Sequence, residues 1–161
     1  MANHLENLIC QFYDWKECIV KSNIKVGRLR RGGYAGELDV VVYNPASREV
    51  IHYEPSLDGD KWADREQRYK KKFELGRKHI KDVFPWLPPN TKLRQVAVFN
   101  NVPFHRKDFL GAEVIGVDDL VKVMKDEIKA EDCVGVNAIP EKYDLLRTIQ
   151  LVICGYYSDP K

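Results

Sequence analysis

Residues 36–56 read GELDVVVYNPASREVIHYEPS. Two runs in this stretch, Glu37–Tyr43 and Val50–Glu54, are rich in the β-branched and aromatic residues that are typical of strands. Between them lies Asn44–Glu49, whose asparagine, proline and serine are typical of a turn. The stretch therefore predicts an antiparallel β-hairpin.

The expected register of this hairpin brings two acidic residues together. Folding the chain at the middle of the turn places Val41 opposite His52, and Asp39 opposite Glu54. Opposed residues of an antiparallel pair point to the same face, with Cβ atoms about 5 Å apart. Ser56 shares that face if the strand continues past Glu54. A slip of one residue would separate the two acids.

Two carboxylates this close repel each other, so Asp39 and Glu54 need a compensating cation. Mg²⁺ prefers oxygen ligands and is often held by one or two carboxylates, with water and substrate phosphate completing its shell. The alternative is that each acid is solvated or is paired with an arginine such as Arg28 or Arg31. His52 either contacts the substrate or is a partly buried strand residue with a hydrogen bond.

The segment after the hairpin predicts a long helix from Asp60 to about Phe84, because apolar residues recur every 3.6 positions and prolines follow. The other expected elements are a helix at 3–16, one or two strands within 18–26, a glycine-rich basic connection at 28–36, strands at 93–100 and 113–117, a helix capped by Asp118 and a helix from Pro140. This order predicts an α/β fold in which helices flank a mixed sheet. We expect one domain over residues 1–161, with a core at about 5–117 and C-terminal helices within 118–157.

The motifs Gly36–Val40 (GELDV) and His52–Ser56 (HYEPS), with Glu6 in the first helix, resemble the PD-(D/E)xK nuclease superfamily. The resemblance implies a restriction-endonuclease-like fold. It also implies that Asp39 and Glu54 bind Mg²⁺ or Mn²⁺, and that Glu6 assists them as a third metal-site residue.

The resemblance extends over residues 5–100 and fails at one position, because Ser56 stands where the family has a lysine. That lysine orients the attacking water and offsets charge on the phosphate. Helix 60–84 offers replacements, and its periodicity predicts that Lys72 flanks the apolar face on one side and Lys70 on the other, while Lys71 points away. We expect Lys72 to be the catalytic amine and Lys70 to be the second choice. The alternative is that these lysines only keep the outer face of the helix solvated.

The net charge of this 161-residue, 18.7 kDa chain is +2, so no strong overall field favours a polyanion. Positive charge is instead clustered, and Arg28, Arg30 and Arg31 are predicted to contact nucleic acid. The longest stretch without a charged residue has 11 residues, at 148–158, whereas a membrane span needs about 20. Four isolated cysteines predict reduced thiols in a cytoplasmic protein, with no thiolate metal site.

Together these patterns predict a magnesium-dependent endo- or exonuclease that hydrolyses phosphodiester bonds, with DNA as the expected substrate. The alternative is a catalytically degraded module of the same fold that binds nucleic acid or protein. An ammonium within about 4–6 Å of both carboxylates would favour the enzyme. No membrane partner is expected, and a homodimer or a partner subunit stays open.

Overall fold

The computed structural model describes residues 3–103, 108–129 and 131–157. Its contacts divide the chain into two compact units, residues 1–117 and 118–161. The first unit contains the whole sheet and two helices, and the second contains most of α3 (Val117–Ile128) and all of α4 (Asp144–Ile153). The interpretation of residues 1–161 as one domain stays a prediction.

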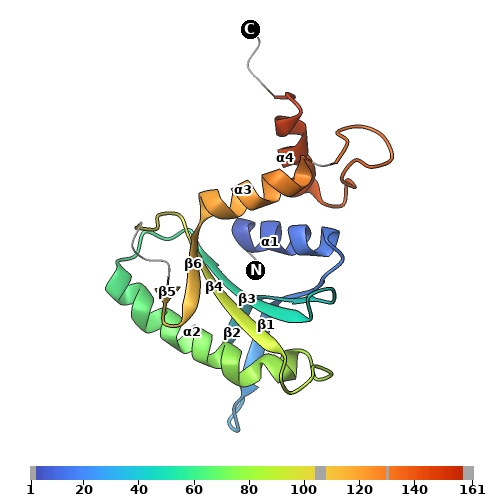
Figure 1. The fold of residues 1–161 in the computed structure, drawn as a ribbon. Coiled ribbons are helices and arrows are strands. Elements are labelled where there is room, and N and C mark those ends of the chain that lie inside the picture. Colours follow the sequence, from blue (N-terminus) through green and yellow to red (C-terminus); the bar gives the residue numbers. More distant parts are fainter. Residues whose placement is uncertain (1–2, 104–107, 130, 158–161) are drawn as a thin grey trace. The chain divides into compact units, whose positions relative to one another are not determined.

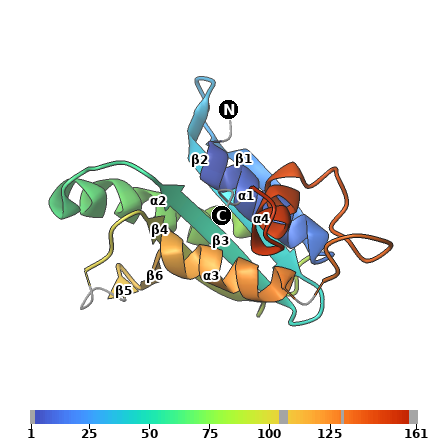
Figure 2. The ribbon, with the colours of Figure 1, turned by 90° about the horizontal axis from the view of Figure 1, so that it is seen from above.

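The described residues form a six-stranded mixed sheet with the order β1-β2-β3-β4-β6-β5. Strands β1, β2 and β3 pair antiparallel, β3, β4 and β6 pair parallel, and β5 returns antiparallel to β6. Figures 1 and 2 show β1 and β5 at opposite edges of this sheet. The strands are β1 (Ile19–Arg28), β2 (Tyr34–Asn44), β3 (Glu49–Ser56), β4 (Lys92–Phe99), β5 (Asp108–Phe109) and β6 (Ala112–Gly116).

The register predicted for the β2–β3 hairpin is confirmed. Val41 pairs with His52, and the regular ladder continues to Val40 and Tyr53. The turn forms because the side-chain oxygen of Asn44 accepts hydrogen bonds from the next backbone N–H groups, that of Ala46 at 2.9 Å included. The hairpin is therefore specified by local turn chemistry and by strand alternation.

Helices α1 (His4–Trp15) and α2 (Trp62–Val83) cover opposite faces of the sheet (Figure 1). The hydroxyl groups of Tyr13 in α1 and Tyr53 in β3 share a hydrogen bond of 2.5 Å. On the other face, the ring of Phe73 in α2 meets the edge of His52. Alternation along β3 thus sends Tyr53 to one helix and His52 to the other.

The apolar face of α2 packs on the sheet as its periodicity predicts. Tyr69 and Phe73 are buried in an aromatic cluster with Phe99 and Phe109, and the ring centroids of Tyr69 and Phe99 are 5.0 Å apart. A second cluster near the end of α2 includes Val83, Phe84 and Leu87 with valines of the hairpin. This packing holds α2 against the sheet along most of its length.

Several boundaries differ from the expected ones. Helix α3 begins at Val117, so that Asp118 lies in its first turn, and α4 begins at Asp144 because residues 140–143 form a separate turn. Of the one or two strands expected within 18–26 the structure has one, β1, which extends to Arg28, and Tyr34–Gly36 of the expected connection belong to β2. The two-residue strand β5 was not predicted, since so short a segment has no detectable periodicity.

The expectation of reduced cysteines is wrong for two of the four. Cys133 and Cys154 form a disulfide in the second unit, with Cα atoms 6.3 Å apart. Isolated cysteines carry no pairing signal, because the bond depends on the spatial approach of residues 21 positions apart. Cys10 and Cys18 are free thiols. None of the helices in the described segments is long and apolar enough to cross a membrane.

Candidate active site at the end of the hairpin

Three charged side chains from separate elements meet where the β2–β3 ladder ends. The ammonium nitrogen of Lys72 in α2 lies 2.7 Å from Asp39 Oδ2 in β2 and also contacts Glu54 Oε2 in β3. The Glu54 side chain is fully buried, whereas those of Asp39 and Lys72 are 14% and 28% exposed. One cation therefore joins both carboxylates at the edge of the core.

The Glu54 carboxylate also bridges the end of the hairpin. Its Oε1 accepts a hydrogen bond from the backbone N–H of Asp39 at 3.4 Å, just beyond the last ladder pair. Its Oε1 also lies 2.7 Å from Nε2 of His52, which is buried two residues earlier on the same face. The side chain thus takes the place of the next ladder bond and links the two strands.

The hydrogen bonds around His52 determine which of its ring nitrogens carries a proton. Gln95 in β4 accepts a bond from Arg77 at 2.7 Å through its oxygen, and its Nε2 lies 2.9 Å from the carbonyl oxygen of Phe73. Both contacts orient the amide so that Nε2 donates to Nδ1 of His52, 3.1 Å away. His52 Nδ1 is therefore an acceptor, and Nε2–H is the donor to Glu54.

This polar network lies directly under Gly76 of α2. A Cβ atom at Gly76 would lie 2.7 Å from His52 Cε1 and 2.8 Å from Gln95 Nε2, and still closer to His52 Nδ1. Only glycine lets the helix backbone approach His52 this closely. The close approach brings Lys72, one turn earlier, over the end of the hairpin.

The pKa values of the three groups are strongly coupled. Burial and the neighbouring Glu54 carboxylate raise the pKa of Asp39 to about 8. Burial also opposes ionisation of Glu54, but the His52 hydrogen bond and the charge of Lys72 outweigh it and lower its pKa to about 2. Burial would lower the pKa of Lys72, and the two carboxylates reverse this and raise it. Asp39 is thus the carboxylate of the pair that takes up a proton more readily, and Glu54 is the one that stays ionised beside Lys72.

Glu6 lies within electrostatic range of this cluster and is itself buried. Burial raises its pKa, and the Glu54 charge acts in the same direction. Its carboxylate accepts hydrogen bonds from the backbone and the side chain of Asn3, which caps helix α1, at 3.2 and 2.5 Å. Glu6 therefore has a structural role at the start of α1, close to the acidic pair.

Ser56 is directed to another carboxylate. Its hydroxyl donates to Asp58, which also accepts bonds from Arg65 and Arg68 of α2. Burial would raise the pKa of Asp58, but the bonds from Ser56 and Arg68 lower it to about 2. This link, which the sequence did not predict, joins the end of β3 to the start of α2.

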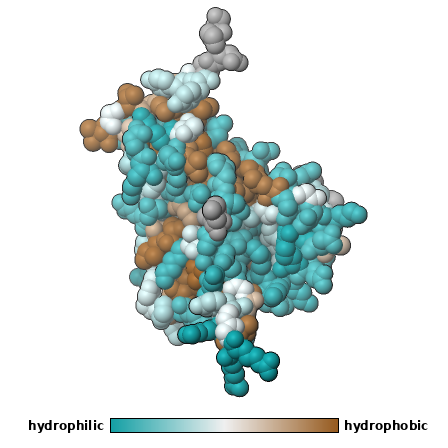
Figure 3. All heavy atoms as spheres, turned by 180° about the vertical axis from the view of Figure 1, so that it is seen from behind, coloured by the Kyte–Doolittle hydropathy of each residue, from teal (hydrophilic) through white to brown (hydrophobic). Residues whose placement is uncertain are grey.

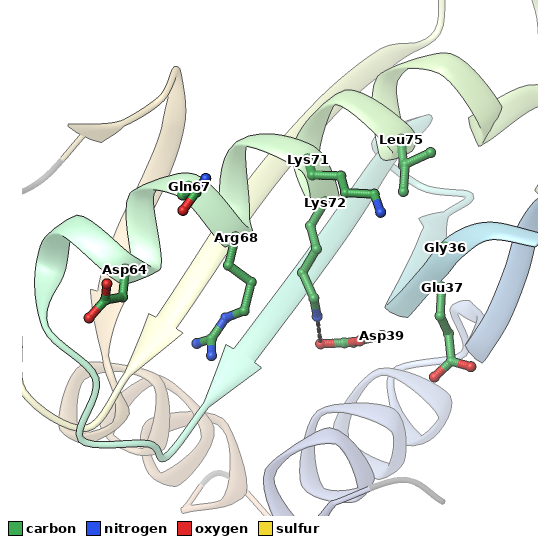
Figure 4. A pocket seen from close by; sticks show the side chains of 9 residues that line it. All are labelled: Gly36, Glu37, Asp39, Asp64, Gln67, Arg68, Lys71, Lys72 and Leu75. Atoms are coloured by element: carbon green, nitrogen blue, oxygen red, sulfur yellow. Dashed lines mark hydrogen bonds and ion pairs between the residues drawn. The ribbon is translucent and has the colours of Figure 1, made fainter.

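An open cavity of about 550 Å³ adjoins Asp39 and Lys72 (Figure 4). Its lining residues come from α2 and from β2, and Lys72 of α2 reaches across to Asp39 of β2. Lys71, which was expected to point away from the sheet, borders this cavity. The lining residues are Gly36, Glu37, Asp39, Asp64, Gln67, Arg68, Lys71, Lys72 and Leu75.

The remaining predicted residues lie elsewhere in the first unit. Lys70 is exposed and does not line the cavity, so the structure brings Lys72, and not Lys70, to the acidic pair. Arg28, Arg30 and Arg31 are exposed at the loop that joins β1 and β2. They form no ion pair with either acid among the described contacts.

Asp39 and Glu54 are the two residues of this cluster that could hold a divalent cation. Among the described residues, no group of three or more His, Cys, Asp or Glu side chains is arranged to hold a metal. Of the two acids only Asp39 borders the open cavity, and the fully buried Glu54 is joined to it through Lys72, which contacts both. Mg²⁺ is commonly held by one or two carboxylates, with water and phosphate as the other ligands.

No known protein family, curated protein or solved structure matches this chain. The likeness to the PD-(D/E)xK superfamily therefore rests on the GELDV and HYEPS motifs and on Glu6, and it stays a proposal.

Gln95, Arg77 and Asp58 are the site residues that sequence reasoning missed. Gln95 carried a usable signal, because it is a polar residue within the otherwise buried strand 95–99 and pairs with His52 in the parallel ladder. Arg77 and Asp58 carried no such signal, because charged residues are common on surface helices and in loops.

Proposed function

We propose that this protein is a metal-dependent nuclease with a restriction-endonuclease-like fold, which hydrolyses phosphodiester bonds of DNA. The observation that carries the proposal is the contact of the Lys72 ammonium with both carboxylates of the Asp39–Glu54 pair. A lysine of α2 thus supplies the cation that the family pattern places at Ser56. The order of β1, β2, β3, α2 and β4 supports the same family.

The residues of the cluster have separable roles in this reaction. Asp39 and Glu54 would hold Mg²⁺ or Mn²⁺, which when bound polarises the phosphate and lowers the pKa of water. His52 keeps Glu54 oriented through Nε2–H. Lys72 would donate a hydrogen bond to the attacking water and offset negative charge on the phosphate. Water oxygen bonds to phosphorus and the bond to the leaving oxygen breaks. The attacking water gives its proton to solvent, and the leaving oxygen takes up a proton from solvent to become a hydroxyl group.

The cavity beside the cluster supports a phosphate-bearing substrate. Lys71 and Lys72 both border it, and Lys71 is exposed to solvent. Cationic side chains beside a metal-binding pair suit the phosphodiester backbone, whose contacts position a nucleic acid without reading its sequence.

The binding module of the same fold is the second candidate function. Glu54 is fully buried, and Lys72 occupies the space between the two carboxylates. If Lys72 keeps that position permanently, the centre is closed to a metal and the surrounding basic surface would only bind nucleic acid.

Cleavage of supercoiled plasmid and of single-stranded oligonucleotide with Mg²⁺ or Mn²⁺ tests the proposal. We expect metal-dependent cleavage by the wild type, and a rate at least about a hundredfold lower for Asp39→Asn and for Lys72→Met, the usual effect of losing a group that acts on the proton or charge of the reaction. Lys70→Met is the matched control, since it removes the same charge from an exposed position of the same helix, and it should retain cleavage.

Two results would contradict the nuclease. The first is cleavage that Asp39→Asn leaves unchanged, which indicates a contaminant or another site. The second is absence of cleavage in a wild-type preparation that retains nucleic acid without metal, which favours the binding module.

A further inference from the structure

One projecting hairpin of the first unit carries basic residues without any acidic residue. Residues 18–36 contain two lysines and three arginines and no acidic residue, whereas the net charge of the whole chain is only +2. The rest of the chain is therefore net negative. Strands β1 and β2 extend together beyond the other strands of the sheet at the bottom of Figure 1, and the corresponding tip in Figure 3 is mostly hydrophilic.

The hairpin is a formed structure with a defined loop. Arg28 pairs with Tyr34, and the backbone N–H of Leu29 donates to the carbonyl of Gly33 at 3.0 Å. A second bond, from Gly32 N–H to the Leu29 carbonyl, also measures 3.0 Å and closes the turn. Positive φ angles at Gly32 and Gly33, of 90° and 80°, suit glycine at this turn. The tip arginines are therefore presented on a preformed ribbon.

Helix α2 sets the direction in which the ribbon leaves the sheet. A Cβ at Gly36 would lie 2.5 Å from Leu75 Cδ1, and one at Gly27 would lie 3.0 Å from His79 Nε2. Gly36 and Leu75 also line the cavity that Asp39 and Lys72 border. The base of the ribbon is thus continuous with the candidate active site.

The tip carries apolar as well as basic side chains. Arg28, Arg30 and Arg31 are exposed, and between and beside them Leu29 and Tyr34 are 50% and 49% exposed. A basic two-stranded ribbon of this kind matches a groove of duplex nucleic acid, where cations contact phosphates and larger side chains contact sugars and bases.

We propose that the β1–β2 hairpin binds a groove of double-stranded nucleic acid beyond the cleavage site. The position of the cleavage site is taken from the proposed function, on which this inference rests. Five residues of extended strand separate Tyr34 from Asp39, a distance of about 17 Å. This is about five base pairs of duplex at 3.4 Å each. The substrate must therefore extend at least that far on the hairpin side.

Fluorescence anisotropy in EDTA measures binding without cleavage. The probes are a duplex DNA of about 20 base pairs, which exceeds the required reach, and one of its strands. The test variant is Arg30→Ala with Arg31→Ala, and the charge-matched control is Lys122→Ala with Lys125→Ala, on exposed positions of α3. Exposed substitutions of this kind leave folding intact.

We expect the wild type to prefer the duplex to the single strand, and the arginine variant to lose at least about tenfold in duplex affinity. The slope of log affinity against log salt should fall by about two, since each lost phosphate contact contributes about 0.9. The lysine control should change affinity less than about twofold. Tyr34→Ala should weaken binding and leave the salt slope unchanged, because its ring carries no charge.

Equal losses in the arginine variant and the lysine control would overturn the inference. So would a preference for the single strand, or equally tight hairpin-dependent binding to anionic phosphatidylserine vesicles. These results separate the hairpin inference from the proposed nuclease activity. Duplex binding through the hairpin without metal-dependent cleavage supports the inference and refutes the enzyme. Metal-dependent cleavage that the hairpin substitutions leave unchanged supports the enzyme and refutes the inference.

Discussion

Replacing Gly76 by alanine should destabilise the protein, although alanine is the better helix former. In an unhindered helix the change would stabilise by about 1 kcal/mol. Here the new methyl would lie 2.8 Å from Gln95 Nε2 and closer still to the His52 ring, and overpacking of this kind costs about 1–3 kcal/mol.

The displaced His52 would also weaken its bonds to Gln95 and Glu54. Each such bond contributes about 1 kcal/mol, and more where a charged group takes part. Subtracting the gain in helix propensity leaves a net loss of about 2–4 kcal/mol. Gly76→Ala should therefore show the opposite sign to a helix-propensity effect.

Urea unfolding followed by circular dichroism measures this free energy. Glu74→Ala is the matched control, because Glu74 is exposed on the same helix, and its change should stay within about 0.5 kcal/mol. A Gly76→Ala protein as stable as the wild type, or more stable, would show that α2 does not press on His52 and would refute the close packing of Gly76 on this ring.

Three further outcomes follow from the same structure. The pKa of Asp58 is about 2 in the folded protein and near 3.8 when unfolded, so its contribution is present above about pH 4 and is lost as the pH falls to about 2. Asp58→Asn should lower the free energy of unfolding by about 1 kcal/mol at pH 7, a modest value because the carboxylate is partly exposed, and the difference from the wild type should vanish near pH 2. A difference that does not change with pH would contradict the ion pair. Lys72→Met should lower the free energy of unfolding by about 3 kcal/mol at pH 7, because it leaves the buried Glu54 carboxylate without its cation. The loss should be smaller at pH 4, where Glu54 of the variant takes up a proton. An equal loss at both pH values in urea titrations would argue against the charge contact. Reduction of Cys133–Cys154 should destabilise the second unit by about 3 kcal/mol, so that hydrogen exchange accelerates in α4 and not in α2, and equal acceleration in both would disprove a local effect.

Local patterns were enough to predict the hairpin and its main consequence. The alternation of apolar residues in β2 and β3, with the Asn44 turn between them, specified the register that places Asp39 near Glu54. The apolar periodicity of α2 likewise predicted the side of the helix on which Lys72 lies, and the structure brings Lys72 to both acids. Both features depend on repeats of two or 3.6 residues, which a sequence displays directly.

The helical-wheel prediction of which α2 side chains face the site was less accurate. Lys71 was expected to face away from the sheet, yet it borders the cavity together with Arg68. A long side chain reaches well to either side of its Cα position, so an exposed residue can still line a wide, open cavity.

Residues that meet across the fold were beyond sequence reasoning. The orientation of His52 depends on Gln95 and Arg77, which lie on β4 and α2 and approach it only after the parallel pairing of β3 with β4. The disulfide between Cys133 and Cys154 depends in the same way on spatial approach. Strand register and helix faces follow from interactions between near neighbours along the chain. The hydrogen-bond partners of His52, the burial of Glu54 and the raised pKa of Asp39 arise only after distant segments pack together and exclude water from the site.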